Sequence, residues 1–392
     1  MAAPWKKFWR RITDGVAIQE LWVQFHAEAR ASYELYSKEV AWATSERPWY
    51  RGRVLRLVRA MFWAMMVKLS PARRVLFLIA LVLLLFPHLR FHDAHGEFDS
   101  GGLAFFGGVA LLILLALELA DRVSMKRDLE IAREIQGWLM PAAPPQVPGM
   151  DIAFSTRPAN TVAGDYYDAF FRPGSPQRLL VVVADVAGKS VPAALLMATV
   201  QASLRTLAAG PFPLLEVIAL LNRYLCSQNP EGRRFTTAFL AEIDPASGDF
   251  AYVNAGHNWP VLRRASGAVE RLETGGLPLG IRPNAVYESG AGTLAAGDLL
   301  VIFTDGLVEA ENDKQDEYGE PRMFEVIAGV GKGSAAEALG QLTASVNGFV
   351  GATRQHDDIT CLVLRVFAPG APGAQPSSAR LHEEAAYRSD QT

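Results

Sequence analysis

Five acidic residues stand at the ends of apolar segments, where an unpaired carboxylate is least expected. Two of them close the apolar runs 179–184 and 299–304, two precede the run 359–364, and one follows a short Ala-Gly pair. They are Asp165, Asp185, Asp305, Asp357 and Asp358. An unpaired buried charge is very costly, and few Lys, Arg or His residues lie beside these positions in the sequence. A hard divalent cation shared by several of these oxygens would resolve the cost.

The composition limits the class of protein. The chain has 392 residues, half of them hydrophobic, which leaves room for more than one folded unit. Its net charge of −3 argues against a general nucleic-acid binder, which would be basic. The only two cysteines, Cys226 and Cys361, lie in apolar contexts and form no disulfide framework, which suits a reducing compartment.

Two apolar segments predict a membrane hairpin. Residues 75–86 are apolar without interruption, and 103–120 are apolar except for one Glu. The second segment would span roughly 27 Å as a helix, close to the thickness of a bilayer core. Residues 51–74 carry seven Lys and Arg residues and no acidic residue, whereas 90–99 carries three acidic residues and one Arg. The positive-inside rule then places both termini in the cytoplasm, with the lipid bilayer as a partner. The alternative is a pair of buried helices in a soluble core.

The segment after this hairpin reads as a connector helix. Ile131, Ile135, Trp138 and Leu139 repeat at intervals of one to four residues, and prolines then end the helix. Two interpretations stay open, a solvated helix or a short coil that forms a homodimer, because two heptads are too few to establish a coiled coil. We hypothesise that the connector sets the position of the helices predicted in 191–227.

The sequence therefore divides into five expected parts. These are an N-terminal cytoplasmic helical region (1–74), two transmembrane helices (75–120), a connector helix with a Pro-rich linker (121–148), a folded domain that carries the carboxylates (149–367) and a disordered tail (368–392).

The folded domain is expected to be α+β, because strands cluster and helices fall between and after them. Strands are predicted at 152–156, 167–171, 179–184, 237–243, 249–254, 299–304 and 359–367. Helices are predicted at 191–207, 214–227, 322–327 and 335–349.

One nucleotide-binding interpretation fails on the residues. The stretch 187–190 resembles the end of a phosphate-binding P-loop, but that motif needs a glycine five residues before Gly188. Val183 stands there, inside a predicted strand, so no glycine-rich cradle for phosphate is present.

Six short motifs occur in an order that carries a family resemblance. They are DYYD (165–168), DVAGK (185–189), NAGHN (254–258), LPLG (277–280), TDG (304–306) and HDDIT (356–360). Together, over 131–366, they resemble the SpoIIE-like branch of the metal-dependent (PPM-type) protein serine/threonine phosphatases. The resemblance implies an α-β-β-α sandwich domain with two Mn²⁺ or Mg²⁺ ions at one end of the sandwich.

Roles for individual residues follow from the same resemblance. Asp185 would bridge the two ions, Asp165 and the Val186 carbonyl would bind one of them, and Asp305 and Asp357 the other. Asp358 is also expected among the metal ligands, although it stands where other branches often carry Asn. Catalysis would act through Asp185 and Asp305, by a water that the metals activate for in-line attack on phosphorus. Oxygen ligands alone disfavour zinc.

Further residues of these motifs would support the ligands. They are Asp168, Gly306 and His257. His257 could act as a general acid, but a loop histidine between Gly256 and Asn258 more often holds a turn. Lys189 is expected to be a surface or rim charge. We rate a phosphate-binding role of Arg157 low.

The resemblance implies a bacterial protein phosphatase in the inner (plasma) membrane, multi-pass, with its catalytic domain in the cytoplasm. Its substrate would be phosphoserine or phosphothreonine on a regulatory protein, typically an anti-sigma-factor antagonist, and no nucleic-acid partner is expected. Two alternatives stay open: a catalytically weak membrane scaffold that binds a signalling partner through the same fold, and a phosphatase that acts on a small metabolite.

Overall fold

The computed structural model describes residues 62–63, 66–86, 90–93, 96–99, 102–174, 177–229 and 234–368. Most of the expected N-terminal region and the expected disordered tail from residue 369 lie outside the described residues. The chain forms two compact units, Met1–Ser124 and Met125–Thr392, which are considered separately.

The first unit contains two apolar helices. Helix α4 spans Pro71–Leu85, and α5 begins at Leu103 and continues to Leu139, so the boundary expected at residue 120 falls inside one helix. Between them, β1 (Arg90–Asp93) pairs antiparallel with β2 (Gly96–Asp99). A Cβ atom on Gly107 would lie 3.0 Å from the Ala80 carbonyl oxygen, so glycine lets α5 approach α4 closely.

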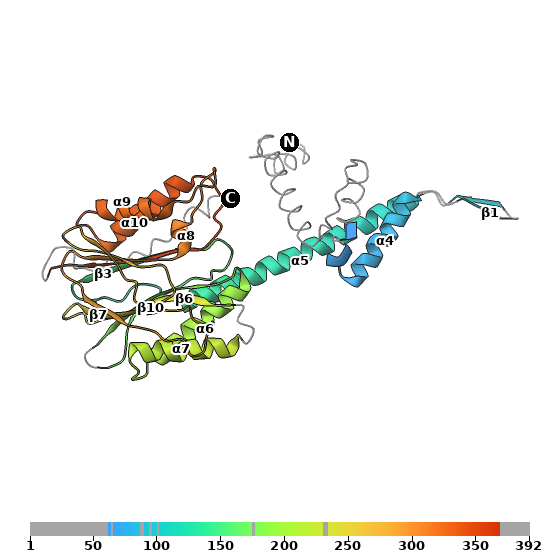
Figure 1. Ribbon diagram of the computed structural model, residues 1–392. Helices are drawn as coiled ribbons and strands as arrows, with labels where there is room; N and C mark the ends of the chain where they lie inside the picture. Colours follow the sequence, from blue (N-terminus) through green and yellow to red (C-terminus); the bar gives the residue numbers. More distant parts are fainter. Residues whose placement is uncertain are drawn as a thin grey trace, which may run out of the picture. The chain divides into compact units, whose positions relative to one another are not determined.

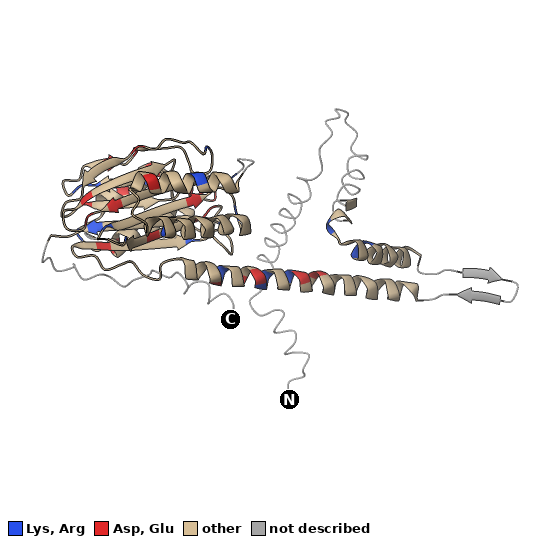
Figure 2. Ribbon diagram, turned by 90° about the horizontal axis from the view of Figure 1, so that it is seen from below, with Lys and Arg blue, Asp and Glu red and all other residues tan. Residues whose placement is uncertain are grey.

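Length and composition make α5 a candidate membrane span, and α6 (Val191–Ala208) passes the same test. Figure 2 shows no charged residue in the first part of α5, and the sequence places the first charge of this helix at Glu118. Helix α6 instead has a buried face that includes Met197 and Leu204, so its apolar composition serves the core of the folded domain. The two apolar helices α4 and α5 fit a hairpin.

The second unit is built on two sheets. The first has the order β10-β7-β6-β5-β4, with β11 also on β7; the second has the order β3-β13-β12-β8-β9. The strands of the first sheet are β4 (Tyr166–Phe171), β5 (Leu179–Val186), β6 (Thr236–Ile243), β7 (Asp249–Ala255), β10 (Gly275–Gly276) and β11 (Gly290–Thr293). Those of the second are β3 (Met150–Arg157), β8 (Val261–Arg263), β9 (Val269–Arg271), β12 (Leu299–Phe303) and β13 (Ile359–Val366). All described pairings are antiparallel except that of β10 with β7.

Helix pairs cover the outer faces of both sheets. In Figure 1, α9 (Gly319–Gly329) and α10 (Ala335–Val350) lie on one side of the sheets, and α6 and α7 (Leu214–Gln228) lie on the other. One core fills the space between the sheets and beneath α6 and α7, and a second core lies beneath α9 and α10. The expected α+β class and the α-β-β-α sandwich are confirmed.

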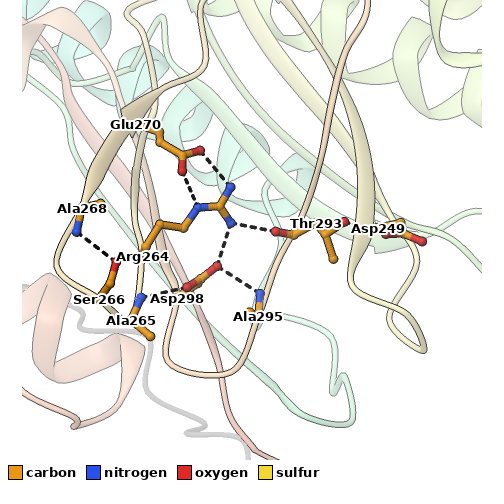
Figure 3. A network of polar contacts seen from close by, with 9 residues as sticks. All are labelled: Asp249, Arg264, Ala265, Ser266, Ala268, Glu270, Thr293, Ala295 and Asp298. Carbon is orange, nitrogen blue, oxygen red and sulfur yellow. Dashed lines mark hydrogen bonds and ion pairs between the residues drawn. The ribbon is translucent and has the colours of Figure 1, made fainter.

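A polar network fixes the start of β12, at the end of that strand away from Asp305. The Arg264 guanidinium binds both oxygens of Glu270 at 2.7 and 2.8 Å and donates to Asp298 at 2.9 Å (Figure 3). The buried Asp298 carboxylate also accepts the amides of Ala265 and Ala295. The network ties the β8–β9 hairpin to the turn before β12 and so helps to fix the strand that leads to Asp305.

The residue before α6 has a strained backbone. Ser190 has φ 65° and ψ −151°, a conformation that costs a non-glycine residue about 1–3 kcal/mol, and its side chain makes no capping hydrogen bond. We therefore expect Ser190→Gly to raise the free energy of unfolding by about 1 kcal/mol in denaturant titrations. The control Ser190→Ala keeps the Cβ atom and should leave stability nearly unchanged. A loss of stability in the glycine variant would contradict the assignment of strain.

Candidate active site

The strand register places Asp165 beside Asp185. Strands β4 and β5 are antiparallel, with Tyr166 opposite Ala184. The residue before β4 and the residue after Ala184 therefore meet at the same end of the pair. The charges of Asp165 and Asp185 lie close enough together to raise the pKa of the Asp165 carboxyl.

The second sheet brings Asp305 to Asp357 and Asp358 in the same way. Strands β12 and β13 are antiparallel, with Phe303 opposite Cys361. Asp305 begins the short helix α8 (Asp305–Val308) directly beyond β12, and the two other carboxylates lead into β13. The negative charges of Asp357 and Asp358 both raise the pKa of the Asp305 carboxyl.

The two groups form one cluster across the sandwich. Burial is the main cause that raises the pKa of Asp185 to about 7, and the charges of Asp305 and Asp357, which come from the other sheet, contribute to this rise. Thr304 joins the sheets directly, because its hydroxyl donates to Asp165 at 2.9 Å and its backbone amide donates to the Thr360 carbonyl at 3.0 Å. The five carboxylates singled out in the sequence, Asp165, Asp185, Asp305, Asp357 and Asp358, are therefore brought together.

The electrostatics of this cluster are unfavourable for the protein alone. Asp165 is almost fully buried, and burial raises its pKa well above the ordinary value, with the Asp185 charge second. Burial is also the main cause of the raised pKa of Asp305. Buried carboxylates that repel one another favour protonation or a bound cation. The cluster is therefore a cation-seeking site, and its oxygen donors suit Mg²⁺ or Mn²⁺.

Asp358 differs from the other carboxylates, because backbone amides hold both of its oxygens. Ala159 donates to one oxygen at 2.7 Å and Gly164 to the other at 2.6 Å. Burial raises its pKa, and these two hydrogen bonds oppose the rise. The contacts fix the loop before Asp165, so Asp358 positions that carboxylate.

Glycine is required at one place where the backbone passes the cluster, and it eases a tight approach at a second. A Cβ atom on Gly306 would lie 2.1 Å from the Asp358 carbonyl oxygen, which only glycine avoids. A Cβ on Gly164 would lie 3.2 Å from the Val186 carbonyl oxygen, so the loop before Asp165 runs close to the end of β5. The close approach keeps the Val186 carbonyl beside the cluster.

Asp168 faces another set of partners. Its fully buried carboxylate receives two hydrogen bonds of 2.8 Å from Arg205 on α6 and one of 2.7 Å from the Tyr166 hydroxyl. Those contacts join β4 to α6 and do not involve the five clustered carboxylates. The structure thus gives Asp168 a structural function, and its expected support of the metal ligands stays a prediction.

His257 lies one side chain away from the cluster. Its Nδ1 is 2.9 Å from the Thr237 hydroxyl, and Thr237 pairs with Asp185 across β5 and β6. Burial lowers the pKa of the imidazole to about 4, and the Phe303 backbone only partly opposes this effect. The ring is neutral near pH 7, which favours a structural role over that of a cationic general acid.

Three residues with close contacts to the site were not assigned to it from the sequence. Lys189 lies 3.0 Å from Asp357, and Arg157 is held by the side chains of Asn347 and Gln355. Gln136 of α5 forms a two-way hydrogen-bonded pair with the backbone of Ala163, at 2.7 and 2.9 Å. Motif position indicated only that Lys189 would lie at the rim of the site, and the sequence gave no signal for the individual contacts, because each joins residues distant in the sequence.

A cavity of about 170 Å³ opens beside the cluster. Its walls carry both signs of charge, and Asp357 and Gly306 belong to them. The other lining residues are Arg157, Lys189, Glu309, Ala310, Glu311, Glu317, Val350, Gln355, His356 and Ile359. Through Asp357 the cavity reaches the edge of the carboxylate cluster.

The raised pKa of Asp185 predicts a charge-dependent stability. A carboxyl whose pKa folding raises from 3.8 to about 7 makes the native state progressively less stable as pH rises between these two values, and the loss is complete above about pH 7. In chelator, Asp185→Asn should therefore unfold at a higher temperature than the wild type at pH 8, and the difference should vanish near pH 4. With added Mn²⁺ the wild type should unfold at a higher temperature than Asp185→Asn, because the metal stabilises only the wild type. Parallel melting curves at all pH values would contradict the assignment.

Comparison with known proteins identifies the family. Residues 175–367 match the model of the SpoIIE family, described as stage II sporulation protein E. The phosphoserine phosphatase RsbU of Bacillus subtilis is 30% identical over 242 residues, which cover 62% of this chain and 70% of RsbU. The chain belongs to the SpoIIE family. The residues of this SpoIIE-family protein that match the model lie within the second unit described above.

Other relatives extend the comparison. Protein IcfG of Synechocystis is 26% identical over 277 residues, and the phosphoserine phosphatase RsbP of Bacillus subtilis is 27% identical over 194. The chain spans less than half of either protein, 43% of IcfG and 47% of RsbP, so the likeness concerns only part of their length.

Solved structures agree on the fold. The RsbU and RsbW domains of Rv1364c from Mycobacterium tuberculosis match with a TM-score of 0.50 and 28% identity, over 60% of this chain and 64% of that one. The SiaA-PP2C domain of Pseudomonas aeruginosa matches with a TM-score of 0.54 and 21% identity, over 63% of this chain and 98% of the domain. The second match supports the SpoIIE-family fold alone.

Proposed function

We propose that this SpoIIE-family protein is a metal-dependent phosphatase that removes phosphate from phosphoserine or phosphothreonine on a regulatory protein. The observation that carries the proposal is the convergence of five carboxylates from both sheets at one site. The names of RsbU and RsbP, both phosphoserine phosphatases, support the choice of substrate class. An anti-sigma-factor antagonist is the regulatory protein that we expect as substrate.

Four carboxylates and one carbonyl would hold two Mn²⁺ or Mg²⁺ ions. They are Asp165, Asp185, Asp305 and Asp357, with the Val186 carbonyl. Within the described residues, no three His, Cys, Asp or Glu side chains form a ready-made metal-binding group, so cation binding would draw these oxygens closer together. Bound divalent cations supply positive charge that polarises a phosphate ester and makes water more acidic.

The remaining residues of the site hold the proposed metal ligands in position. Asp358 and Thr304 hold the segment that carries Asp165, through hydrogen bonds of 2.6–2.9 Å. Gly306 lets the start of α8 pass the Asp358 backbone, and this close passage positions Asp305. His257, neutral at physiological pH, supports the β6 strand beside Asp185 through Thr237. Preorganised charge of this kind is what phosphoryl transfer requires of a protein.

Membrane anchoring and dimerisation belong to the same proposal. The apolar helices α4 and α5 would anchor the protein in a bacterial inner membrane, with the phosphatase domain in the cytoplasm. In the part of α5 that belongs to the second unit, Ile131 and Ile135 are each 46% exposed and Trp138 is 73% exposed. Such an exposed apolar row suits a homodimer through the connector.

Gln136 links this connector to the site. Its side chain is buried and binds Ala163 in both directions, two residues before Asp165. We expect Gln136→Ala to weaken Mn²⁺ binding by roughly tenfold, since residues that orient ligands typically contribute 10- to 100-fold to metal affinity. The exposed neighbour Glu134 provides the control, and Glu134→Ala should bind Mn²⁺ like the wild type. Equal Mn²⁺ affinity in both variants would show that Gln136 does not help to orient the metal ligands.

The proposed function is tested by metal-dependent hydrolysis with the full-length chain. Purified protein is stripped of metal, supplied with Mn²⁺ and given phosphoserine peptides, an aryl phosphate and sugar phosphates. We expect turnover of the peptides and the aryl phosphate that chelator abolishes. Folded protein without turnover would favour the scaffold, and preference for sugar phosphates would favour a metabolite phosphatase.

A further inference from the structure

The carboxylate cluster contains a cation supplied by the protein. The Lys189 ammonium lies 3.0 Å from Asp357 and donates to the His356 carbonyl at 2.6 Å. Of the ion pairs within the described residues, this is the only one that reaches the five clustered carboxylates. Its charge also lowers the pKa of Asp305, against the other influences there.

The other basic groups in the cavity wall are engaged elsewhere. Arg157 is bound by Asn347 and Gln355, and the His356 ring lies 3.9 Å from Glu311. Neither makes an ion pair with the cluster among the described contacts. Lys189 therefore places a positive charge beside Asp357, where a metal ion bound to this carboxylate would place its own.

The loop between β5 and α6 directs Lys189 back to this position. Gly188 has φ 123° and Ser190 has φ 65°, so residues on both sides of the lysine adopt the left-handed region. The backbone amide of Ala187 donates a hydrogen bond of 2.9 Å to the Phe235 carbonyl, and this bond anchors the base of the loop. A strained backbone on a loop that carries a charged side chain is a feature of functional sites.

We infer that Lys189 is a built-in counter-ion that competes with divalent cations for Asp357 and thereby sets the metal affinity of the site. The inference rests on the proposed metal site. A metal ion on Asp357 would repel the nearby ammonium, so we expect binding of the metal to displace the lysine. Both Lys189 and Asp357 are about half exposed, which leaves the ammonium room to move into solvent.

Removal of the lysine then has two opposite effects. In the metal-free protein, Lys189→Met leaves Asp357 without its counter-ion, so the midpoint of thermal unfolding in chelator should fall. In metal titrations the competing charge is gone, so Mn²⁺ should bind more tightly. The gain should be roughly three- to tenfold, the range expected when a partly exposed ion pair no longer has to be broken.

The experiment is isothermal titration of Mn²⁺ into metal-free, full-length wild type and three variants, together with melting curves in chelator. Lys189→Arg keeps the charge and the pairing and should bind within about twofold of the wild type. Lys332→Met removes an exposed lysine away from the cluster and should do the same. Tighter binding in Lys189→Met alone supports the inference.

Two other results are possible. Unchanged or weaker Mn²⁺ binding in Lys189→Met, with normal binding by the wild type, would overturn the role of Lys189 and leave the proposed function standing. Absence of Mn²⁺ binding by the folded wild type would overturn both.

Discussion

Replacement of Asp305 by Asn is expected to lower Mn²⁺-dependent turnover by on the order of 10³-fold or more, while the domain stays folded. Asn keeps the size of the side chain but removes a negative oxygen from the cluster formed with Asp185 and Asp357. In chelator the variant should be as stable as the wild type or more stable, because one repelling charge is gone. Loss of activity with gain of metal-free stability separates a metal ligand from a structural carboxylate.

The matched control for this variant is Asp313→Asn, which changes an exposed carboxylate in the loop after α8. Initial rates on a phosphoserine peptide at saturating Mn²⁺ should match the wild type in the control. A turnover for Asp305→Asn within about tenfold of the wild type would remove Asp305 from the catalytic site.

Replacement of Asp168 by Ala should lower the free energy of unfolding by about 2–3 kcal/mol. The change leaves Arg205 and the Tyr166 hydroxyl without their shared acceptor. Because the Arg205 side chain is 42% exposed and can turn to water, the loss should be smaller than for a fully buried pair. Denaturant titration measures it, and Asp313→Ala should change stability by less than about 0.5 kcal/mol.

Metal binding distinguishes this structural role from the role expected for Asp168 in the sequence. If Asp168 only joins β4 to α6, the folded variant should bind Mn²⁺ with the affinity of the wild type. A large loss of affinity without a loss of stability would instead place Asp168 among the residues that support the metal ligands.

The main strands and helices could be predicted because the pattern of apolar residues in their sequences indicates which residues are buried. Runs such as 179–184 and 299–303 are apolar throughout, and in the structure they are central strands with both faces covered. The short strands β8 to β11 and the one-turn helix α8 were not predicted. The strands are short and two of them consist largely of glycine, so pairing with neighbouring strands, not local propensity, holds them in place. Helix α8 packs against β13.

The site was predictable to the extent that strand ends determine it. Carboxylates next to apolar runs meet when antiparallel neighbours align those ends, as β4 with β5 and β12 with β13 do. The partners of single side chains could not be predicted in the same way. The pairing of Asp168 with Arg205 and that of Lys189 with Asp357 each depend on how a helix or loop packs against a distant strand.

The carboxylate cluster is proposed to bind divalent cations through four of its members, and anomalous scattering from crystals of the Mn²⁺-soaked protein tests this most directly. The account predicts two manganese peaks among Asp165, Asp185, Asp305 and Asp357, which disappear in the Asp185→Asn variant. Manganese absent from that position in well-ordered crystals, or bound elsewhere with these carboxylates free, would contradict it.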